Sequence, residues 1–246
     1  MSTNQTGHVQ NLVNLGVVIN HLGTFQKNYN PPRSILTIDG LVKLKSDGEI
    51  VLASVTSAEI SSKNAISARS SSFDNLDSLI TRTINALRIS GAQAQTIVQA
   101  ETIVRQLRGQ RATTKPTSKE TAAANDQPTE IVKNTLHNTT MDSKIENFNK
   151  LVQFLTGIAE YKPNEADLSI IALNAKLTDL KTTNASYIAA IAALDAARLE
   201  RNTILYAENS GVVDVAMSVK LYVKSVFGAR SPQYKEISDI VFTKHR

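Results

Sequence analysis

A short phrase occurs twice in the chain, and this repetition constrains the fold more than any other feature of the sequence. The first copy, YNPPRSILTIDGL, begins at Tyr29, and the second, YKPNEADLSIIAL, begins 132 positions later at Tyr161. Proline lacks an amide donor and clashes with a preceding helical turn. Each Tyr-x-Pro therefore marks a corner between two helices.

The match extends well beyond the phrase, as a duplication requires. At the same offset Arg69 pairs with Arg201, and Gly91-Ala92 pairs with Gly228-Ala229 once five additional residues are allowed in the second half. Upstream of the corners, apolar residues recur at an offset of 136. The extra four residues are close to one helical turn, so the apolar face keeps its register. We therefore expect two copies of one three-helix unit.

The landmarks that the two copies share are expected to be structural. They are Tyr29, Pro31 and Arg69 in the first copy and Tyr161, Pro163 and Arg201 in the second. Each proline ends a helix, and each tyrosine ring packs against the corner. Each arginine bonds a carboxylate or lays its aliphatic stem on the core. The alternatives are a contact surface shared by the corners and an anionic ligand bound by an arginine.

Helical periodicity accounts for the apolar residues outside the centre of the chain. Leu12, Leu15 and Ile19 are spaced by three and four residues, which places them on one helical face. Similar patterns predict further helices from Pro32 to about residue 58, over about 61–89, after Gly91, and from Ile145 to Phe227 in several pieces. The chain has no Trp, and aliphatic residues supply most of its apolar surface, as is typical of helix-on-helix packing. The predicted fold class is an all-α helical bundle.

The centre of the chain has a different composition. The stretch GQRATTKPTSKETAAANDQPTE, which begins at Gly109, contains almost no large apolar residue and cannot offset the entropy cost of ordering. We expect a flexible, disordered linker over 109–143. It separates an N-terminal repeat with an extra helix (1–108) from a C-terminal repeat with an extended tail (144–246). The sequence leaves open whether the two halves pack together or form separate bundles.

Several stretches together resemble a family of uncharacterised helical proteins from Bacteroidetes-type bacteria. The resemblance is carried by Tyr29-Asn30-Pro31, LITRTINAL (79–87), YKPNE (161–165), RNTILY (201–206) and VKSVFGARSPQYKEISDIVF (223–242). It covers most of the chain except the linker. The resemblance implies a bacterial, helical protein with an internal duplication, and it brings no activity, substrate or catalytic residue.

Motifs that carry chemistry are scarce. The chain has no cysteine, and its four histidines lack the spacing of metal ligands. No glycine-rich phosphate loop and no Gly-x-Ser-x-Gly elbow occurs. We therefore expect no metal, no cofactor and no catalytic residue, and we rank an enzyme of unknown type third among the functions considered.

Basic residues gather where the helix after Gly91 runs into the linker. They are Arg105, Arg108, Arg111, Lys115 and Lys119, in a chain with a formal net charge of +5. Such a patch could contact nucleic acid, an anionic membrane surface or an acidic protein. The simpler interpretation is that basic residues favour the negative end of a helix dipole and increase solubility.

The tail alternates apolar and polar residues after Pro232. Its candidate docking residues are Pro232, Tyr234, Ile237, Val241 and Phe242. This alternation predicts a short strand or an extended arm that docks on its own bundle or on a neighbouring molecule.

These observations favour a non-enzymatic structural or interaction protein that uses helical faces and associates with itself or with another protein. A basic binding module for nucleic acid or an anionic surface is the alternative. The sequence shows no secretory signal and no apolar run of about 18–20 residues, so we expect no transmembrane segment and a cytoplasmic location.

Overall fold

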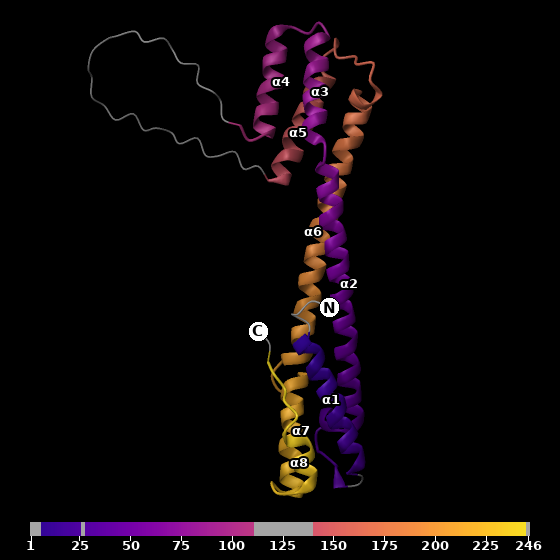
Figure 1. Cartoon of the computed structure of the whole chain (residues 1–246), viewed down its shortest axis with the longest axis vertical. Coiled ribbons are helices and arrows are strands. Elements are labelled where there is room, and N and C mark those ends of the chain that lie inside the picture. Colours follow the sequence, from indigo (N-terminus) through magenta and orange to yellow (C-terminus); the bar gives the residue numbers. More distant parts are fainter. Residues whose placement is uncertain (1–5, 26–27, 111–139, 245–246) are drawn as a thin grey trace, which may run out of the picture. The chain divides into compact units, whose positions relative to one another are not determined.

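The computed structural model describes residues 6–25, 28–110 and 140–244, and every regular element in these ranges is a helix (Figure 1). The elements are α1 (Thr6–Thr24), η2 (Ser34–Leu36), α2 (Ile38–Phe73), α3 (Leu76–Ile89), α4 (Ala94–Leu107), α5 (Met141–Thr156), η3 (Ala166–Leu168), α6 (Ile170–Tyr206), α7 (Val212–Phe227) and α8 (Pro232–Ser238). The predicted all-α class is confirmed. Most of the predicted linker, residues 111–139, lies outside the described residues.

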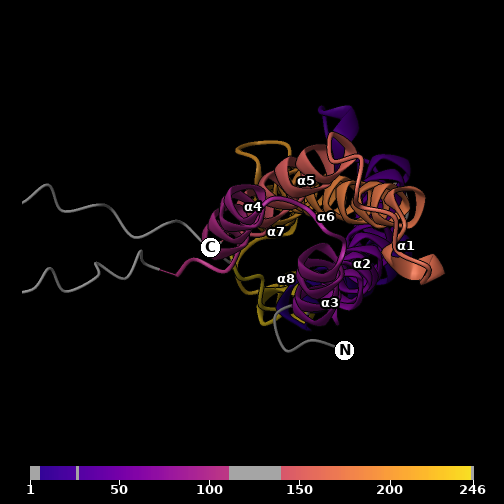
Figure 2. The same ribbon diagram turned by 90° about the horizontal axis from the view of Figure 1, so that it is seen from above.

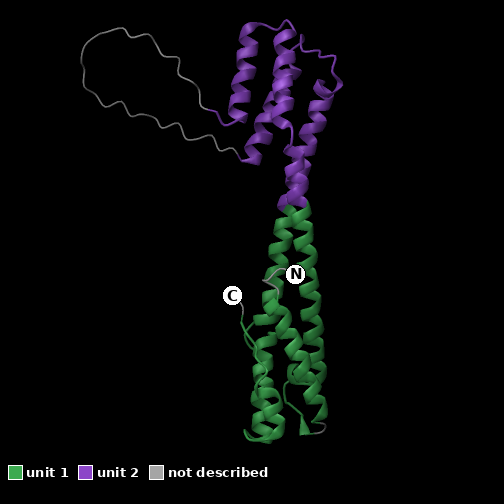
Figure 3. Ribbon diagram, viewed as in Figure 1, with its two compact units in different colours: residues 1–64, 189–246 green, residues 65–188 purple. Residues whose placement is uncertain are grey.

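The chain divides into two compact units, and one of them is built from both ends of the sequence (Figure 3). Unit 1 comprises residues 1–64 and 189–246, and unit 2 comprises residues 65–188. Each of the two longest helices, α2 and α6, therefore contributes residues to both units. This grouping differs from the division at 1–108, 109–143 and 144–246, which was drawn along the sequence and stays a prediction.

Unit 1 has a core formed mainly by α1, the first part of α2, and α7. Leu15, Leu22 and Val219 are fully buried in it. Burying a leucine side chain contributes roughly 1.5–3 kcal/mol. Helices α1 and α2 approach closely at Gly48, where an added Cβ would lie 2.5 Å from a methyl carbon of Leu12. The face of α1 that the helical spacing predicted to meet the core is thus buried in the structure.

Unit 2 has a separate core formed by α3, α4 and α5 together with residues of α6. Helices α4 and α5 lie side by side, as both views of the chain show (Figures 1 and 2). Phe148 of α5 and Leu87 of α3 are fully buried there. Helix α5 begins at a capping residue, because the side chain of Thr140 accepts a hydrogen bond from the amide of Ser143.

Helix α2 is longer than the sequence pattern predicts. A boundary was expected between residues 58 and 61, but the helix continues to Phe73, because these positions contain neither glycine nor proline. The real boundary lies at Asn75, whose φ angle of 61° is left-handed. Asn tolerates this conformation better than most residues. The predicted boundary near residue 60 is therefore wrong, and the two helices expected in this region meet at Asn75 instead.

The tail begins as a helix rather than as a strand. Ser231 caps α8 by accepting a hydrogen bond from the amide of Tyr234, and Pro232 occupies the first turn, where no amide donor is needed. Residues 239–244 follow without helical structure, and we call them the arm. Only this last part of the tail corresponds to the predicted extended conformation.

Candidate interaction surfaces

The two Tyr-x-Pro corners are closed, internally bonded structures. The phenol of Tyr29 donates a hydrogen bond to the carbonyl oxygen of Leu36, and the phenol of Tyr161 donates one to the carbonyl oxygen of Leu168. Both tyrosines are buried. Burial raises the pKa of Tyr29 above its ordinary value, with a smaller contribution from Tyr222. It also raises the pKa of Tyr161. Neither hydroxyl is free to bind a ligand.

The prolines of these corners occupy similar places. Pro31 is buried, and Pro163 is partly buried. Each precedes a short 3-10 helix, η2 or η3, that leads into a long α-helix. The corners therefore redirect the chain, with the proline and the tyrosine of each corner at least partly buried.

The two matched arginines have different surroundings. In unit 2, the guanidinium of Arg69 lies 3.4 Å from the ring centroid of Tyr187 and donates a hydrogen bond of 3.4 Å to the amide oxygen of Asn184. In unit 1, Arg201 donates hydrogen bonds to its neighbour Asn202. Partial burial lowers the pKa of Arg201. A shared role in binding an anion would need similar surroundings, and these differ.

Two residues of the predicted basic patch are described, and both bond within unit 2. Arg108 donates a hydrogen bond of 2.6 Å to the hydroxyl of Thr81, and its Nε lies 3.8 Å from a carboxylate oxygen of Asp77. Arg105 donates one to the hydroxyl of Thr102. Arg111, Lys115 and Lys119 lie outside the described residues, so an anion-binding patch stays a prediction.

The residues predicted to dock from the tail lie in unit 1. Ile237 is buried in the core, and Tyr234 and Phe242 pack against it. Pro232 is exposed at the start of α8, and Val241 is 69% exposed. In this structure the tail therefore packs on its own unit, through three of its five candidate residues.

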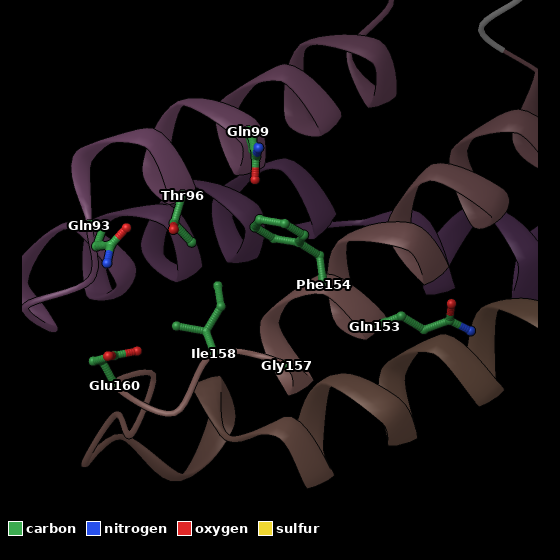
Figure 4. A pocket seen from close by; sticks show the side chains of 8 residues that line it. All are labelled: Gln93, Thr96, Gln99, Gln153, Phe154, Gly157, Ile158 and Glu160. Atoms are coloured by element: carbon green, nitrogen blue, oxygen red, sulfur yellow. The ribbon is translucent and has the colours of Figure 1, made fainter.

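The groove drawn in Figure 4 is an open hollow in unit 2. It has a volume of about 530 Å³ and lies between the start of α4 and the end of α5. Figure 4 shows Thr96 and Gln99 facing the apolar side chains of Phe154 and Ile158. The remaining lining residues are Gln93, Gln153, Gly157 and Glu160. The groove offers amide groups and one carboxylate, without a nucleophile paired to a base.

A smaller hollow occurs at the corresponding place in unit 1. It has a volume of about 240 Å³ and lies between the end of α1 and the start of α8. Phe25 and Phe227 line it, with ring centroids 5.4 Å apart, and Gln233 and Glu236 contribute polar groups. Each hollow thus lies between the helix that precedes a Tyr-x-Pro corner and the final helix of the other half of the chain.

The outward face of α1 is the surface that sequence analysis did not single out. Val9, Val13 and Val17 are all exposed and are spaced by four residues, so they form one stripe opposite the core face. Helix α1 contains no Asp, Glu, Lys or Arg. A solvent-facing helix usually carries charged residues on its outer face. The signal was present in the sequence as a long uncharged stretch.

Among the residues that the structure describes, no three His, Cys, Asp or Glu side chains form a group that could hold a metal ion. No helix in the described ranges has the length and apolar character needed to cross a membrane.

Comparison of the chain with protein-family models, with curated protein sequences and with solved structures gives no match.

Proposed function

We propose that the protein is a non-enzymatic structural or interaction protein that associates with a second copy of itself through helical faces. The observation that carries this proposal is the exposed stripe of Val9, Val13 and Val17 on a helix without Asp, Glu, Lys or Arg. The cores of protein interfaces are depleted of charged residues, and exposed apolar patches mark interaction sites.

A second copy is the partner that fits this stripe best. In a two-fold symmetric dimer, the same patch meets itself. A charged patch would repel its own copy, whereas an uncharged valine stripe does not. The valine stripes of two copies can also pack against each other, since contact between valines leaves no polar group unpaired.

The test measures the molar mass of the purified chain by size-exclusion chromatography with light scattering over a range of concentrations. We expect association that Val13→Lys weakens at least tenfold. Val98→Lys is the matched control, because Val98 is an equally exposed valine on α4. A wild-type chain that stays monomeric at all concentrations, or equal effects of the two substitutions, would contradict the proposal.

We also infer that the chain consists of two copies of one helical unit. Three paired features support this inference: the tyrosine hydrogen bonds at the two corners, the left-handed residues Asn75 and Asn209 before α3 and α7, and the positive φ angles of Gly91 and Gly228 after these helices. Each compact unit then combines parts of both copies. It takes its Tyr-x-Pro corner from one copy and its short helices, α7 and α8 in unit 1 or α3 and α4 in unit 2, from the other copy.

A further inference from the structure

The arm is held by side chains of α1 that form hydrogen bonds to its main chain. Asn11 is 2% exposed and uses both ends of its amide: its Nδ2 donates to the carbonyl oxygen of Thr243 at 2.8 Å, and its Oδ1 accepts from the amide of Thr243 at 3.0 Å. Asn14 donates from Nδ2 to the carbonyl oxygen of Val241 at 2.7 Å. Each bond would form with any residue other than proline in these positions of the arm.

Helix α7 also contacts the arm. Lys220 donates hydrogen bonds to the carbonyl oxygens of Ser238 and Ile240, and again the acceptors are main-chain atoms. Asp214 forms an ion pair of 2.8 Å with Lys244. We call the surface formed by Asn11, Asn14, Asp214 and Lys220 the seam.

The side chains of the arm alternate between the core and solvent. Ile240 and Phe242 pack against the core of unit 1, whereas Val241 points outward and is exposed. The carbonyl groups alternate too, because that of Ile240 faces Lys220 and that of Val241 faces Asn14. Both alternations have the period of an extended chain. The segment that lies on the seam is thus extended and places two apolar residues at alternate positions.

We propose that the seam is a binding site for an extended peptide, and that its external ligand is the arm of a second copy of this chain. The same segment in another molecule carries Ile240, Phe242 and Lys244 and can make each of these contacts. This proposal deepens the self-association proposed above, but it uses a surface other than the valine stripe. The resident arm competes as an intramolecular ligand at an effective concentration of about millimolar. Exchange is therefore expected when the resident arm is weakened.

The first experiment uses a fluorescently labelled peptide, SDIVFTK, which corresponds to residues 238–244. Its binding is measured by anisotropy with the full-length chain carrying Ile240→Ser and Phe242→Ser, which we call the arm variant. We expect the arm variant to bind the peptide at least tenfold more tightly than the wild type does. Val241→Ser is the matched control, because it changes an exposed residue of the same arm and should behave as the wild type.

A modified peptide tests whether the seam recognises the main chain of the arm. N-methylation at the position of Thr243 removes the amide donor to Asn11, and we expect it to weaken binding at least tenfold. Replacing Thr243 by Ala in the peptide leaves the main chain intact, and we expect less than a threefold change. Equal binding of the N-methylated and unmodified peptides would overturn the recognition of the main chain.

The seam itself is tested by substitution in the arm variant. Asn14→Ala should weaken peptide binding about fivefold, and Asn11→Leu should abolish it. Because Asn11 is buried, circular dichroism must show that each variant keeps its helix content and unfolds cooperatively, and Asn14→Ala, at a less buried position, provides a second measurement. If the folded arm variant does not bind the peptide, the proposal is wrong.

A mixing experiment tests whether a second copy supplies the ligand. The arm variant has an open seam, and an Asn11→Leu chain has an intact arm that its own seam holds poorly. Both chains also carry Val13→Lys, so association through the valine stripe is removed. We expect a complex of one chain of each type by light scattering. Peptide binding without such a complex would show that the arm of a second copy is not the ligand of the seam. Association through the valine stripe is tested separately by Val13→Lys and Val98→Lys.

Discussion

Tyr29 donates its phenolic hydrogen to the carbonyl oxygen of Leu36, and the two oxygen atoms are 2.6 Å apart. In the other half of the chain, Tyr161 makes the same bond to the residue seven positions later, Leu168, at 2.8 Å. These bonds tie each corner to the 3-10 helix that follows the proline, and so fix the entry to α2 and to α6.

Substitution of either tyrosine by phenylalanine should destabilise the protein by about 1–2 kcal/mol, because a buried carbonyl loses its hydrogen-bond donor. We expect Tyr29→Phe and Tyr161→Phe to have similar effects in urea unfolding followed by circular dichroism. Tyr187→Phe is the control, since it retains the ring against which Arg69 lies. A control that destabilises as much as the corner variants would show that the corner bonds contribute little.

The same tyrosines should make stability fall at alkaline pH. Burial raises the pKa of Tyr29 and of Tyr161 above the ordinary value of 10.0, so the unfolded chain loses these protons first as pH rises. Their contribution is fully present below pH 10 and is lost above it. Urea unfolding at pH 9, 10 and 11 should show a steeper alkaline loss for the wild type than for Tyr29→Phe. Parallel curves would contradict the raised pKa.

The matched arginines should differ in their contribution to stability. Arg69→Ala removes both the stacking on Tyr187 and the bond to Asn184, and we expect a loss of about 1 kcal/mol. Arg201→Ala removes bonds to the adjacent, exposed Asn202 and should cost less than about 0.5 kcal/mol. Thermal unfolding of the two variants provides the comparison, and a larger loss for Arg201→Ala would be the contrary result.

Replacing the glycines after α3 and α7 by alanine should destabilise the protein. Gly91 and Gly228 have φ angles of 84° and 91°, and nothing lies within 4 Å of an added Cβ, so Ala would be strained by its backbone alone. We expect Gly91→Ala to cost about 1 kcal/mol, and Gly228→Ala to cost about 1–3 kcal/mol, because a ψ angle of 154° places Gly228 in a region almost exclusive to glycine. Gly23→Ala, within α1 and also free of close neighbours, should be neutral or stabilise by up to about 1 kcal/mol. Chemical denaturation distinguishes the two signs.

Local pattern predicted much of the fold but little of its long-range pairing. The spacing of Leu12, Leu15 and Leu22 identified a helix face that is buried, because periodicity reports which side of a helix meets the core. The break expected near residue 60 was wrong, since a change in apolar pattern does not by itself interrupt a helix. The actual break depends on the left-handed residue Asn75, which composition does not mark.

The surfaces proposed for binding were harder to predict. Asn11 and Thr243 are 232 positions apart, and no periodicity links a polar residue on a core-facing position to the main chain of a distant segment. Docking of the tail could be expected from its apolar residues, but not the packing of Phe242 together with the exposure of Val241. That distinction depends on the direction of the extended chain.

The discontinuity of unit 1 sets an order for folding during synthesis. Unit 2 is one continuous stretch, residues 65–188, so the ribosome releases all of it before the second part of unit 1 is made. Leu15, Val18 and Leu22 of α1 are synthesised before unit 2, yet Val219 and Val223 of α7, which complete their core, follow some 200 residues later. At about 5–20 residues per second, this apolar face stays without α7 for at least 10 seconds. We therefore expect a chain that ends before α7 to leave part of the core face of α1 exposed, and to aggregate or be proteolysed more readily than the full chain.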